Sequence, residues 1–404
     1  MSSEQLKHIQ KIRGFQHQKF EFFKKKLIWH IKKQKIQCIL CGSDDVKAEF
    51  IREREIQVLP MGDMLTYVRF RVHRLFCHNC HKRTIESFHF LPHPKSRISK
   101  GLKQMLITER SELSIRAISI KYKIRWNLIK DIEKEYLAKK YKHIQVNHIK
   151  GIGIDEIHIG KNSDGKFIYL TIVRDIKSGN VIHIGDGKGV NALEGLAKKL
   201  KKSKLKVITM DMANTYSSWA EENFPKAKIV YDHFHVIKLM NERLDKFRRR
   251  YIAALDKSYQ SQFKKLRFLF IKNQEDIPPD GQIILKNIRE QFHELGTGYM
   301  FKENLRAIYA NAEDAFDARN AFRRWARAAE ATEIHELQAM AKTIRTKLSG
   351  IITRWTFKGL SNAFMEGFNN KIRWLIRQAY GFHDIDYLKL KIFQLPSIST
   401  QKEM

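Results

Sequence analysis

The four cysteines of this 404-residue chain form two pairs, Cys38 with Cys41 and Cys77 with Cys80, and each pair has two residues between its thiols. Thiolates spaced in this way can reach one ion from a single tight turn, and two such turns supply the four sulfur ligands that structural zinc prefers. The alternatives are two disulfides or four unrelated thiols. Disulfides require an oxidising compartment, and we find no signal peptide that would indicate one. The spacing therefore predicts one structural zinc site.

Three carboxylates stand where a fold could bring them to a second metal site. Asp155 lies in a predicted strand, Asp211 ends another, and Glu366 lies on a predicted helix. Carboxylates that share a site raise one another's pKa unless cations balance their charge. Two magnesium ions about 4 Å apart would do so, and could activate a water or a 3′-hydroxyl at a phosphate. Any one of these acids alone is better explained as a surface carboxylate, so the hypothesis depends on the fold.

The composition indicates a polyanionic partner. Lysine and arginine outnumber aspartate and glutamate by 76 to 43, which gives a formal net charge of +33. Such a surplus favours nucleic acid, because neutralised phosphates release counterions. No lipidation motif or long apolar stretch indicates a membrane, and 43% apolar residues are enough for sizeable cores. We expect a cytoplasmic, DNA-associated protein.

The chain before the first carboxylate divides into three predicted regions. Residues 1–37 contain ten lysines and arginines but two acids, and predict a basic arm that is helical or loosely ordered. Residues 38–93 form the predicted zinc module, with an alternating strand over residues 66–72. Residues 94–147 form a predicted helix-turn-helix domain.

Two short helices carry the helix-turn-helix prediction. Ser114 caps a helix that ends near Tyr122, and a second helix begins near Arg125 after a brief break. This spacing matches a motif whose second helix enters the major groove of DNA, although a generic three-helix bundle would have the same pattern. The side chains that we expect to contact DNA are Arg116, Arg125, Asn127 and Lys130.

The order of elements over residues 148–250 is distinctive. Three predicted strands joined by short turns are followed by alternating helices and strands. The predicted strands are 152–159, 167–173, 181–184, 206–210 and 227–231, and the predicted helices cover 190–202, a segment from 213, and 233–250. This order predicts a mixed sheet with helices on both faces, as in the ribonuclease-H-like fold. We therefore expect a multidomain α+β protein with a mixed α/β catalytic domain of this kind.

The remaining residues are predicted to be mostly helical. Residues 251–350 predict an all-helical insertion, residues 351–394 the second part of the catalytic domain, and residues 395–404 a tail. A final amphipathic helix over 362–380 places Glu366 on its polar face. Three more side chains on that face are expected to contact DNA: Asn370, Arg373 and Arg377.

Four blocks of sequence point to one family: Gly153–Glu156, Asp232–Leu239, Glu366–Arg373 and Ala379–Phe382. In these blocks the chain resembles the DDE transposases of bacterial insertion sequences, ISL-three family, and its N-terminal modules resemble that family's N-terminal half. The resemblance covers nearly the whole chain.

The resemblance implies a function and a set of ligands. Asp155, Asp211 and Glu366 would bind two catalytic magnesium ions, which manganese could replace. The N-terminal modules would bind the terminal inverted repeats. The implied activity is metal-dependent strand cleavage and strand transfer on double-stranded DNA, both element ends and target. The implied active assembly is a self-associated synaptic complex.

Several alternatives remain open from the sequence. Asp232 and His235 resemble a pair that positions DNA near the metal site, but a capped helix start with a buried histidine fits equally. Trp325 could stack on a base, although a core position is favoured. Glu221 or Glu222 would replace Glu366 if the third ligand is misassigned. A regulator that retains only DNA binding and a structure-selective nuclease are the rival functions.

Overall fold

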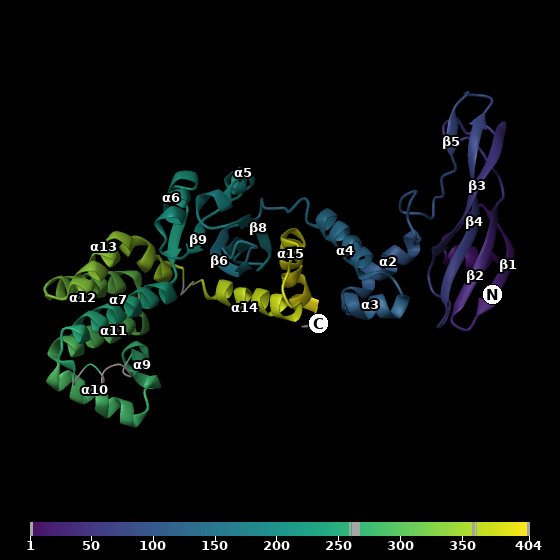
Figure 1. Cartoon of the computed structure of the whole chain (residues 1–404). Coiled ribbons are helices and arrows are strands. Elements are labelled where there is room, and N and C mark those ends of the chain that lie inside the picture. Colours follow the sequence, from purple (N-terminus) through teal and green to yellow (C-terminus); the bar gives the residue numbers. More distant parts are fainter. Residues whose placement is uncertain (1–2, 258–259, 261–266, 358–359, 361, 402–404) are drawn as a thin grey trace. The chain divides into compact units, whose positions relative to one another are not determined.

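The computed structural model describes residues 3–257, 260, 267–357, 360 and 362–401. The chain divides into two compact units, Met1–Lys142 and His143–Met404 (Figure 1). In the part of the chain that the structure describes, no helix is both long and apolar enough to cross a membrane.

The first unit contains a five-stranded sheet. Its strand order is β1-β2-β4-β3, and β5 pairs with β4. The elements are α1 (Ser3–Ile9), β1 (Phe15–Phe23), β2 (Lys26–Lys33), β3 (Val46–Gln57), β4 (Leu65–Cys77) and β5 (Arg83–Ile85). The predicted strand over residues 66–72 is confirmed within β4, where Val68, Phe70 and Val72 are buried and Arg71 is exposed.

The prediction of a helical or loosely ordered arm over residues 1–37 is wrong. This segment contributes a helix and two strands to the first unit, and β2 pairs with β4 in parallel. Phe15, Trp29 and Ile31 enter the same core as Val68 and Phe70. Most of the lysines lie at the ends of β2 and in the turn before it, at positions 24–26, 32 and 33. The charge of the segment therefore concealed a strand pattern that its apolar residues carry.

Three helices complete the first unit: α2 (Lys100–Glu109), α3 (Ile115–Tyr122) and α4 (Trp126–Lys140). The Ser114 hydroxyl caps α3 by accepting a hydrogen bond from the N–H of Ala117 at 3.1 Å. Lys123 ends α3 in the left-handed conformation and turns the chain into α4. Ile118 and Ile129 are fully buried between the helices. The two predicted helices are thus confirmed.

The second unit is built on a mixed sheet of order β10-β9-β6-β7-β8. Its strands are β6 (Gly151–Lys161), β7 (Phe167–Asp175), β8 (Val181–Asp186), β9 (Val207–Met210) and β10 (Lys228–Tyr231). β6, β7 and β8 are antiparallel neighbours, whereas β9 and β10 run parallel to β6. This confirms the predicted order of strands. The helix predicted over 190–202 is instead a short 3₁₀ turn, Val190–Leu193, and α5 (Leu196–Leu200), separated at Gly195 with φ +73°.

Helices cover both faces of this sheet. On one face Ile152 and Ile154 of β6 pack in a core with Tyr216 of α6 (Asn214–Asn223). On the other face Ile157 packs with Met365 of α14 (Ala363–Gln378), and α15 (Ile385–Gln401) joins that core. Successive residues of β6 therefore serve opposite faces, as strand geometry requires.

The helical part of the second unit begins with α7 (His233–Ala253) and continues through α9 to α13 (Figure 1). Its elements are α9 (Arg267–Ile271), the 3₁₀ turn Gln274–Asp276, α10 (Pro279–Gln291), α11 (His293–Asn311), α12 (Ala315–Glu330) and α13 (His335–Thr356). The predicted limits after residues 250, 350 and 394 are wrong, because they fall inside α7, α13 and α15. Long helices run across these limits, which the sequence boundaries did not anticipate.

Candidate metal centres

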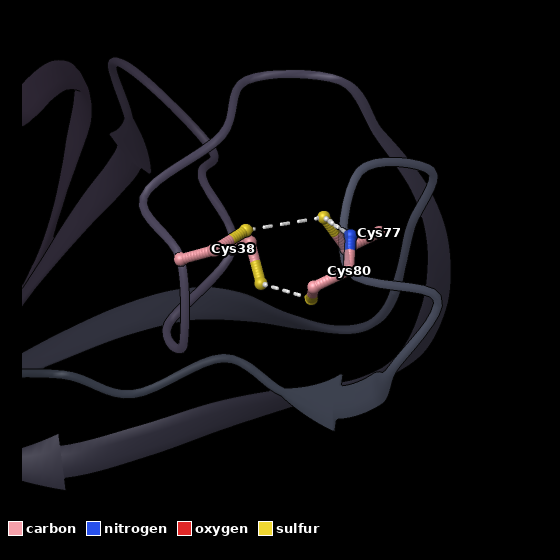
Figure 2. Close-up of side chains that lie close together, drawn as sticks. Cys38, Cys77 and Cys80 are labelled. Carbon is pink, nitrogen blue, oxygen red and sulfur yellow. Dashed lines mark hydrogen bonds between the residues drawn. The ribbon is translucent and has the colours of Figure 1, made fainter.

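The four cysteines converge on one point of the first unit (Figure 2). Their Sγ atoms all lie within 4.8 Å of one another, with Cys38 and Cys80 at 3.6 Å and Cys41 and Cys77 at 3.5 Å. A tetrahedral ion with Zn–S bonds of about 2.3 Å spaces its sulfurs by about 3.8 Å. These separations are too long for disulfides, and all four thiols are free. The donor set fits zinc.

Backbone geometry builds the two cysteine turns. Gly42 has φ +75° and donates its N–H to the Cys38 carbonyl at 3.0 Å, which closes the first turn. In the second turn the N–H of Cys77 donates to the Lys82 carbonyl at 3.1 Å. Cys77 also pairs with Val46 in the ladder between β3 and β4. The sheet therefore fixes the second cysteine pair close to the chain that leaves the first.

The electrostatics of the cysteines favour a cation. The N–H groups of Cys41 and Leu40 lower the pKa of Cys38 to about 6. The N–H of Lys82 would favour a thiolate at Cys80, but burial and the neighbouring sulfurs outweigh it and raise the pKa of Cys80 to about 12. Cys38 can therefore carry a negative charge, whereas Cys80 can ionise beside it only when a metal ion balances the added charge.

The first two predicted acids meet in the second unit. Asp155 lies in β6, and Asp211 directly follows β9, which pairs with β6 in parallel. Burial raises the pKa of Asp155 to about 6, and the negative charges of Asp211 and Asp232 act in the same direction. The N–H of Glu156 and the charge of His235 oppose this rise. Two further acids and one histidine are therefore close enough to influence the carboxylate of Asp155.

Asp232 is the residue before α7, where the sequence analysis considered a helix cap as one of two alternatives. Its carboxylate caps the helix, accepting from the N–H of Phe234 at 3.3 Å. Burial alone would raise the pKa of Asp232, but hydrogen bonds from His233 and Phe234, together with the charges of His233 and His235, lower it. His235 is half-buried. The cap is thus present, and it stands beside the acidic centre.

Glu366 is placed differently from the aspartates. Its side chain is exposed on α14, although helical spacing puts it on the same face as Asn362 and Asn369. Among the described residues, the four cysteines are the one group of three or more Cys, His, Asp and Glu side chains whose ligand atoms all lie within 4.8 Å of one another. The structure therefore brings Asp155 close to Asp211 and leaves Glu366 exposed.

Two asparagines that the sequence analysis missed as site residues attach α14 to the sheet. Asn362 donates to the Ile154 carbonyl at 3.2 Å and accepts from the Thr209 hydroxyl at 2.6 Å. Asn369 is buried and donates to Asp155 Oδ2 at 2.8 Å. The signal for Asn369 was available, because it lies three residues after Glu366 and hence on the same helix face.

The close approach of α14 to β6 depends on Gly153. A Cβ atom at this position would lie 2.3 Å from the ring of Phe364 and 3.1 Å from Asn362 Oδ1. Arg174 of β7 also contacts the helix, donating to the Phe364 carbonyl at 2.8 Å, with its guanidinium 4.0 Å from the centre of the Phe368 ring. The start of α14 is thus held against the strand that carries Asp155.

Comparison with known proteins agrees with this architecture. The family model of the ISL-three DDE transposases, described as a transposase, matches residues 152–392. The chain belongs to this transposase family. A second model, described as the zinc-finger of transposase IS204/IS1001/IS1096/IS1165, matches residues 34–80 and includes all four cysteines. The zinc ribbon predicted from the cysteine spacing is thereby confirmed.

Curated relatives extend the transposase match to most of the chain. The chain is 25% identical over 361 residues to the transposase for insertion sequence element IS1001 of Bordetella parapertussis, which covers 88% of this chain and 87% of the relative. It is 26% identical over 288 residues to the transposase for IS1557 of Mycobacterium tuberculosis, covering 64% and 63%. These matches support a nucleic-acid-processing enzyme, a transposase, over a regulator without catalysis.

Glu156, the neighbour of Asp155, faces the opposite side of the transposase sheet, as strand alternation predicts. It accepts a hydrogen bond from the Tyr216 hydroxyl at 2.6 Å, and Lys188 lies 3.7 Å from its other oxygen. Tyr216 belongs to α6, on the face away from α14. Glu156 is therefore occupied in a separate polar network.

The residues predicted to contact DNA lie on accessible parts of their helices. On α3 and α4, Arg116, Arg125 and Asn127 are exposed and Lys130 is half-buried. On α14, Asn370, Arg373 and Arg377 are exposed, and Arg373 donates to Asn370 at 2.7 Å. The two groups belong to different units of the chain.

Proposed function

We propose that this chain binds the terminal inverted repeats of an insertion sequence and catalyses metal-dependent DNA strand cleavage and strand transfer. The observation that carries the proposal is the placement of Asp155 and Asp211 on adjoining parallel strands, beneath the helix that carries Glu366. Carboxylates in this topology suit phosphoryl transfer by divalent ions.

Asp155, Asp211 and Glu366 are proposed to hold two magnesium ions, and manganese would substitute. The donor set fits, since carboxylate oxygens are the ligands that magnesium prefers. The site also needs cations, because Asp155 is half-buried among other acids. When bound, the ions would activate the attacking oxygen and stabilise the leaving oxygen of the scissile phosphate.

The protein's own residues orient these ligands. Asn369 fixes one oxygen of Asp155 and the N–H of Glu156 fixes the other. Glu366 lies on the same helix face as Asn369 and would complete the ligand set when cations offset the repulsion between the acids. Asp232 and His235 are proposed to position DNA beside the site, with His235 partly balancing the charge of Asp155.

The first unit is proposed to recognise DNA. Arg125 directly precedes α4, the helix that would enter the major groove, and Asn127 and Lys130 lie in its first turns. Arg116 lies on the preceding helix. The zinc ribbon would support this contact with its basic strands. On α14, Asn370, Arg373 and Arg377 would hold the strand near the metal site. Self-association would bring two element ends and target DNA together.

The test uses the full chain, the DNA that flanks its gene, and a supercoiled target plasmid with magnesium. We expect cleavage at inverted repeats and covalent joining of the freed 3′ ends to the plasmid, and neither product with Asp155→Asn. Strand breaks without joined products would identify a structure-selective nuclease instead. Binding of the flanking DNA without any strand breakage would identify a regulator.

A further inference from the structure

A cavity of about 860 Å³ opens in the second unit between α7, α9, α11 and α13. It begins at His233 and Phe234, the two residues that follow Asp232, so it adjoins the acidic centre. The side chains that matter for its chemistry are Phe234, Lys238, Asn241, Arg306, Tyr309 and Arg354. The volume is within the range of pockets that bind small organic ligands.

The lining of the cavity is cationic. Five lysine and arginine side chains line it against two acids, Glu242 and Asp245. Asp245 pairs with Arg248, which lies outside the lining, at 2.7 Å, and with the lining residues Arg249 at 3.3 Å and Arg267 at 3.6 Å. A wall with this balance attracts an anion. Lys238 is exposed on α7 and so presents its charge at the opening.

Two buried polar atoms of the lining lack a partner. Within the described residues, neither the Tyr309 hydroxyl nor Asn241 Oδ1 has a hydrogen-bond partner. Buried polar groups in folded proteins are nearly always paired. A ligand with both donor and acceptor groups would satisfy these two atoms, which a simple inorganic anion would not do.

Aromatic rings supply the third kind of contact. Tyr309 is held by stacking on Trp355, with ring centres 5.5 Å apart and planes 18° from parallel. The Phe234 side chain is 57% exposed at the mouth of the cavity. Exposed aromatic faces beside basic groups are how proteins bind single-stranded nucleic acid, because every base can stack on a ring.

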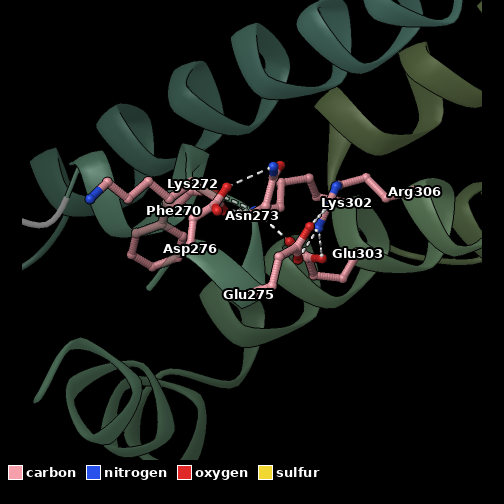
Figure 3. Close-up of polar contacts among 8 residues, drawn as sticks. All are labelled: Phe270, Lys272, Asn273, Glu275, Asp276, Lys302, Glu303 and Arg306. Atoms are coloured by element: carbon pink, nitrogen blue, oxygen red, sulfur yellow. Dashed lines mark hydrogen bonds and ion pairs between the residues drawn. The ribbon is translucent and has the colours of Figure 1, made fainter. Parts of the chain in front are cut away.

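One wall of the cavity is fixed by an ionic cluster (Figure 3). The buried Lys302 ammonium donates to the carbonyl of Phe270 at 3.1 Å and to that of Lys272, and pairs with Glu303 at 2.7 Å. Arg306 binds Glu303 at 2.5 Å and also Glu275. Arg306 therefore has a defined place in the wall before any ligand enters.

We propose that this cavity binds a nucleotide of a single-stranded DNA segment next to the cleavage site. Its base would stack on Phe234 and pair its polar edge with Tyr309 and Asn241, while its phosphate meets Lys238 and Arg354. Arg354 Nη1 lies 3.1 Å from His233 Nδ1, so the phosphate site connects directly to the start of α7 beside Asp232. The inference rests on the proposed function, since it takes the strand that passes the acidic centre as the source of the nucleotide.

The test measures binding by the full chain without divalent metal, in the presence of a chelator. The probes are a duplex with a short single-stranded tail that carries a fluorescent adenine analogue, in both polarities, and a blunt duplex of the same sequence. We expect tighter binding of one tailed duplex, with quenching of the analogue. Phe234→Ala should weaken that binding by about five- to 150-fold and abolish the quenching, because stacking is lost. Lys238→Gln should reduce the slope of log affinity against log salt concentration by about one, because one phosphate contact is lost.

Phe316→Ala is the matched control. Phe316 is 73% exposed and, like Phe234, is the second residue of a helix whose capping aspartate accepts from its N–H. It is not among the residues that line the cavity. Binding of the blunt duplex should be the same for the wild type and all three variants.

Three results would overturn the inference: equal affinity for tailed and blunt duplexes, an equal loss in Phe316→Ala, or a preference for the tail that shows no quenching and is abolished by inorganic phosphate. The last would indicate an anion site. Asp155→Asn should keep the preference for the tail, because no strand is cut in this assay. Failure of strand transfer and failure of the cavity can therefore be told apart.

Discussion

The two candidate metal centres of this chain are assembled to different degrees. The four cysteine sulfurs already lie within 4.8 Å of one another, whereas Glu366 is exposed while Asp155 and Asp211 share their site. The difference follows from charge. A thiol can stay protonated and contact a neighbouring thiolate, as Cys80 and Cys38 do at 3.6 Å, but carboxylates that are ionised at neutral pH repel.

The two centres also differ in how the chain reaches them. Each cysteine pair lies on one short turn, and the β3–β4 ladder holds the turns together. The acids come from β6, the end of β9 and α14, with 154 residues between Asp211 and Glu366. A site made of local turns can be complete by itself, whereas one made of distant elements depends on the contacts that position a whole helix.

Cys77→Ser should have the largest effect. Structural zinc contributes on the order of 10 kcal/mol to folding where a small domain depends on it. We expect about one zinc per wild-type chain, and the variant should lose both the metal and the folded ribbon, as measured by metal analysis and thermal unfolding. The second unit should still unfold cooperatively. Native protein with four freely alkylated thiols and no metal would contradict the zinc assignment.

The second prediction concerns the acids. Asp155→Asn, Asp211→Asn and Glu366→Gln should each reduce strand cleavage and joining by about 100-fold or more, because displacement of the reacting groups by about 1 Å costs on that order. Folding and DNA binding, measured by circular dichroism and gel shift, should be unchanged.

Glu156→Gln is the control for these variants, because its side chain bonds Tyr216 on the other face. A much smaller loss of cleavage is expected there. If Glu366→Gln cleaves like the wild type, the third ligand is misassigned. Glu221 and Glu222, both exposed on α6, would then be tested.

Gly153→Ala tests whether the packing of α14 against β6 limits the cleavage rate at the acidic centre. The new methyl group would meet the ring of Phe364 at 2.3 Å, and overpacking of this kind costs about 1–3 kcal/mol. We expect a reduced melting temperature of the second unit and slower cleavage, with zinc content unchanged. Gly367→Ala is the control on α14 itself, since a Cβ there meets nothing within 4 Å. Equal activity of the two variants would show that the position of α14 is not limiting.

The smallest effect is expected for Asn369→Ala. It removes the 2.8 Å hydrogen bond to Asp155, and a bond to a charged group contributes about 1.5–3 kcal/mol. Cleavage should fall by roughly tenfold with little change in DNA affinity, as measured by single-turnover kinetics and gel shift. Asn370→Ala, one residue further on the exposed side, should reduce affinity more than the cleavage rate. The reverse pattern would exchange the roles of these two residues.

Much of this protein could be predicted from patterns within short stretches of sequence. The spacing of Cys38, Cys41, Cys77 and Cys80 was sufficient for the zinc ribbon, because each pair needs only one turn. Alternation along β6 gave the opposite orientations of Asp155 and Glu156, and the order of strands and helices gave the mixed sheet. Each of these depends on neighbours within a few residues or on the order of elements.

Only the tertiary structure decided the rest. The pairing of β2 with β4 put the basic N-terminal segment into a sheet, and the bond from Asn369 to Asp155 joins residues 214 positions apart. The cavity beside Asp232 combines side chains of four helices. Local spacing does not encode such contacts, because they form when separate apolar faces are buried together and each buried polar group must find a partner across the core.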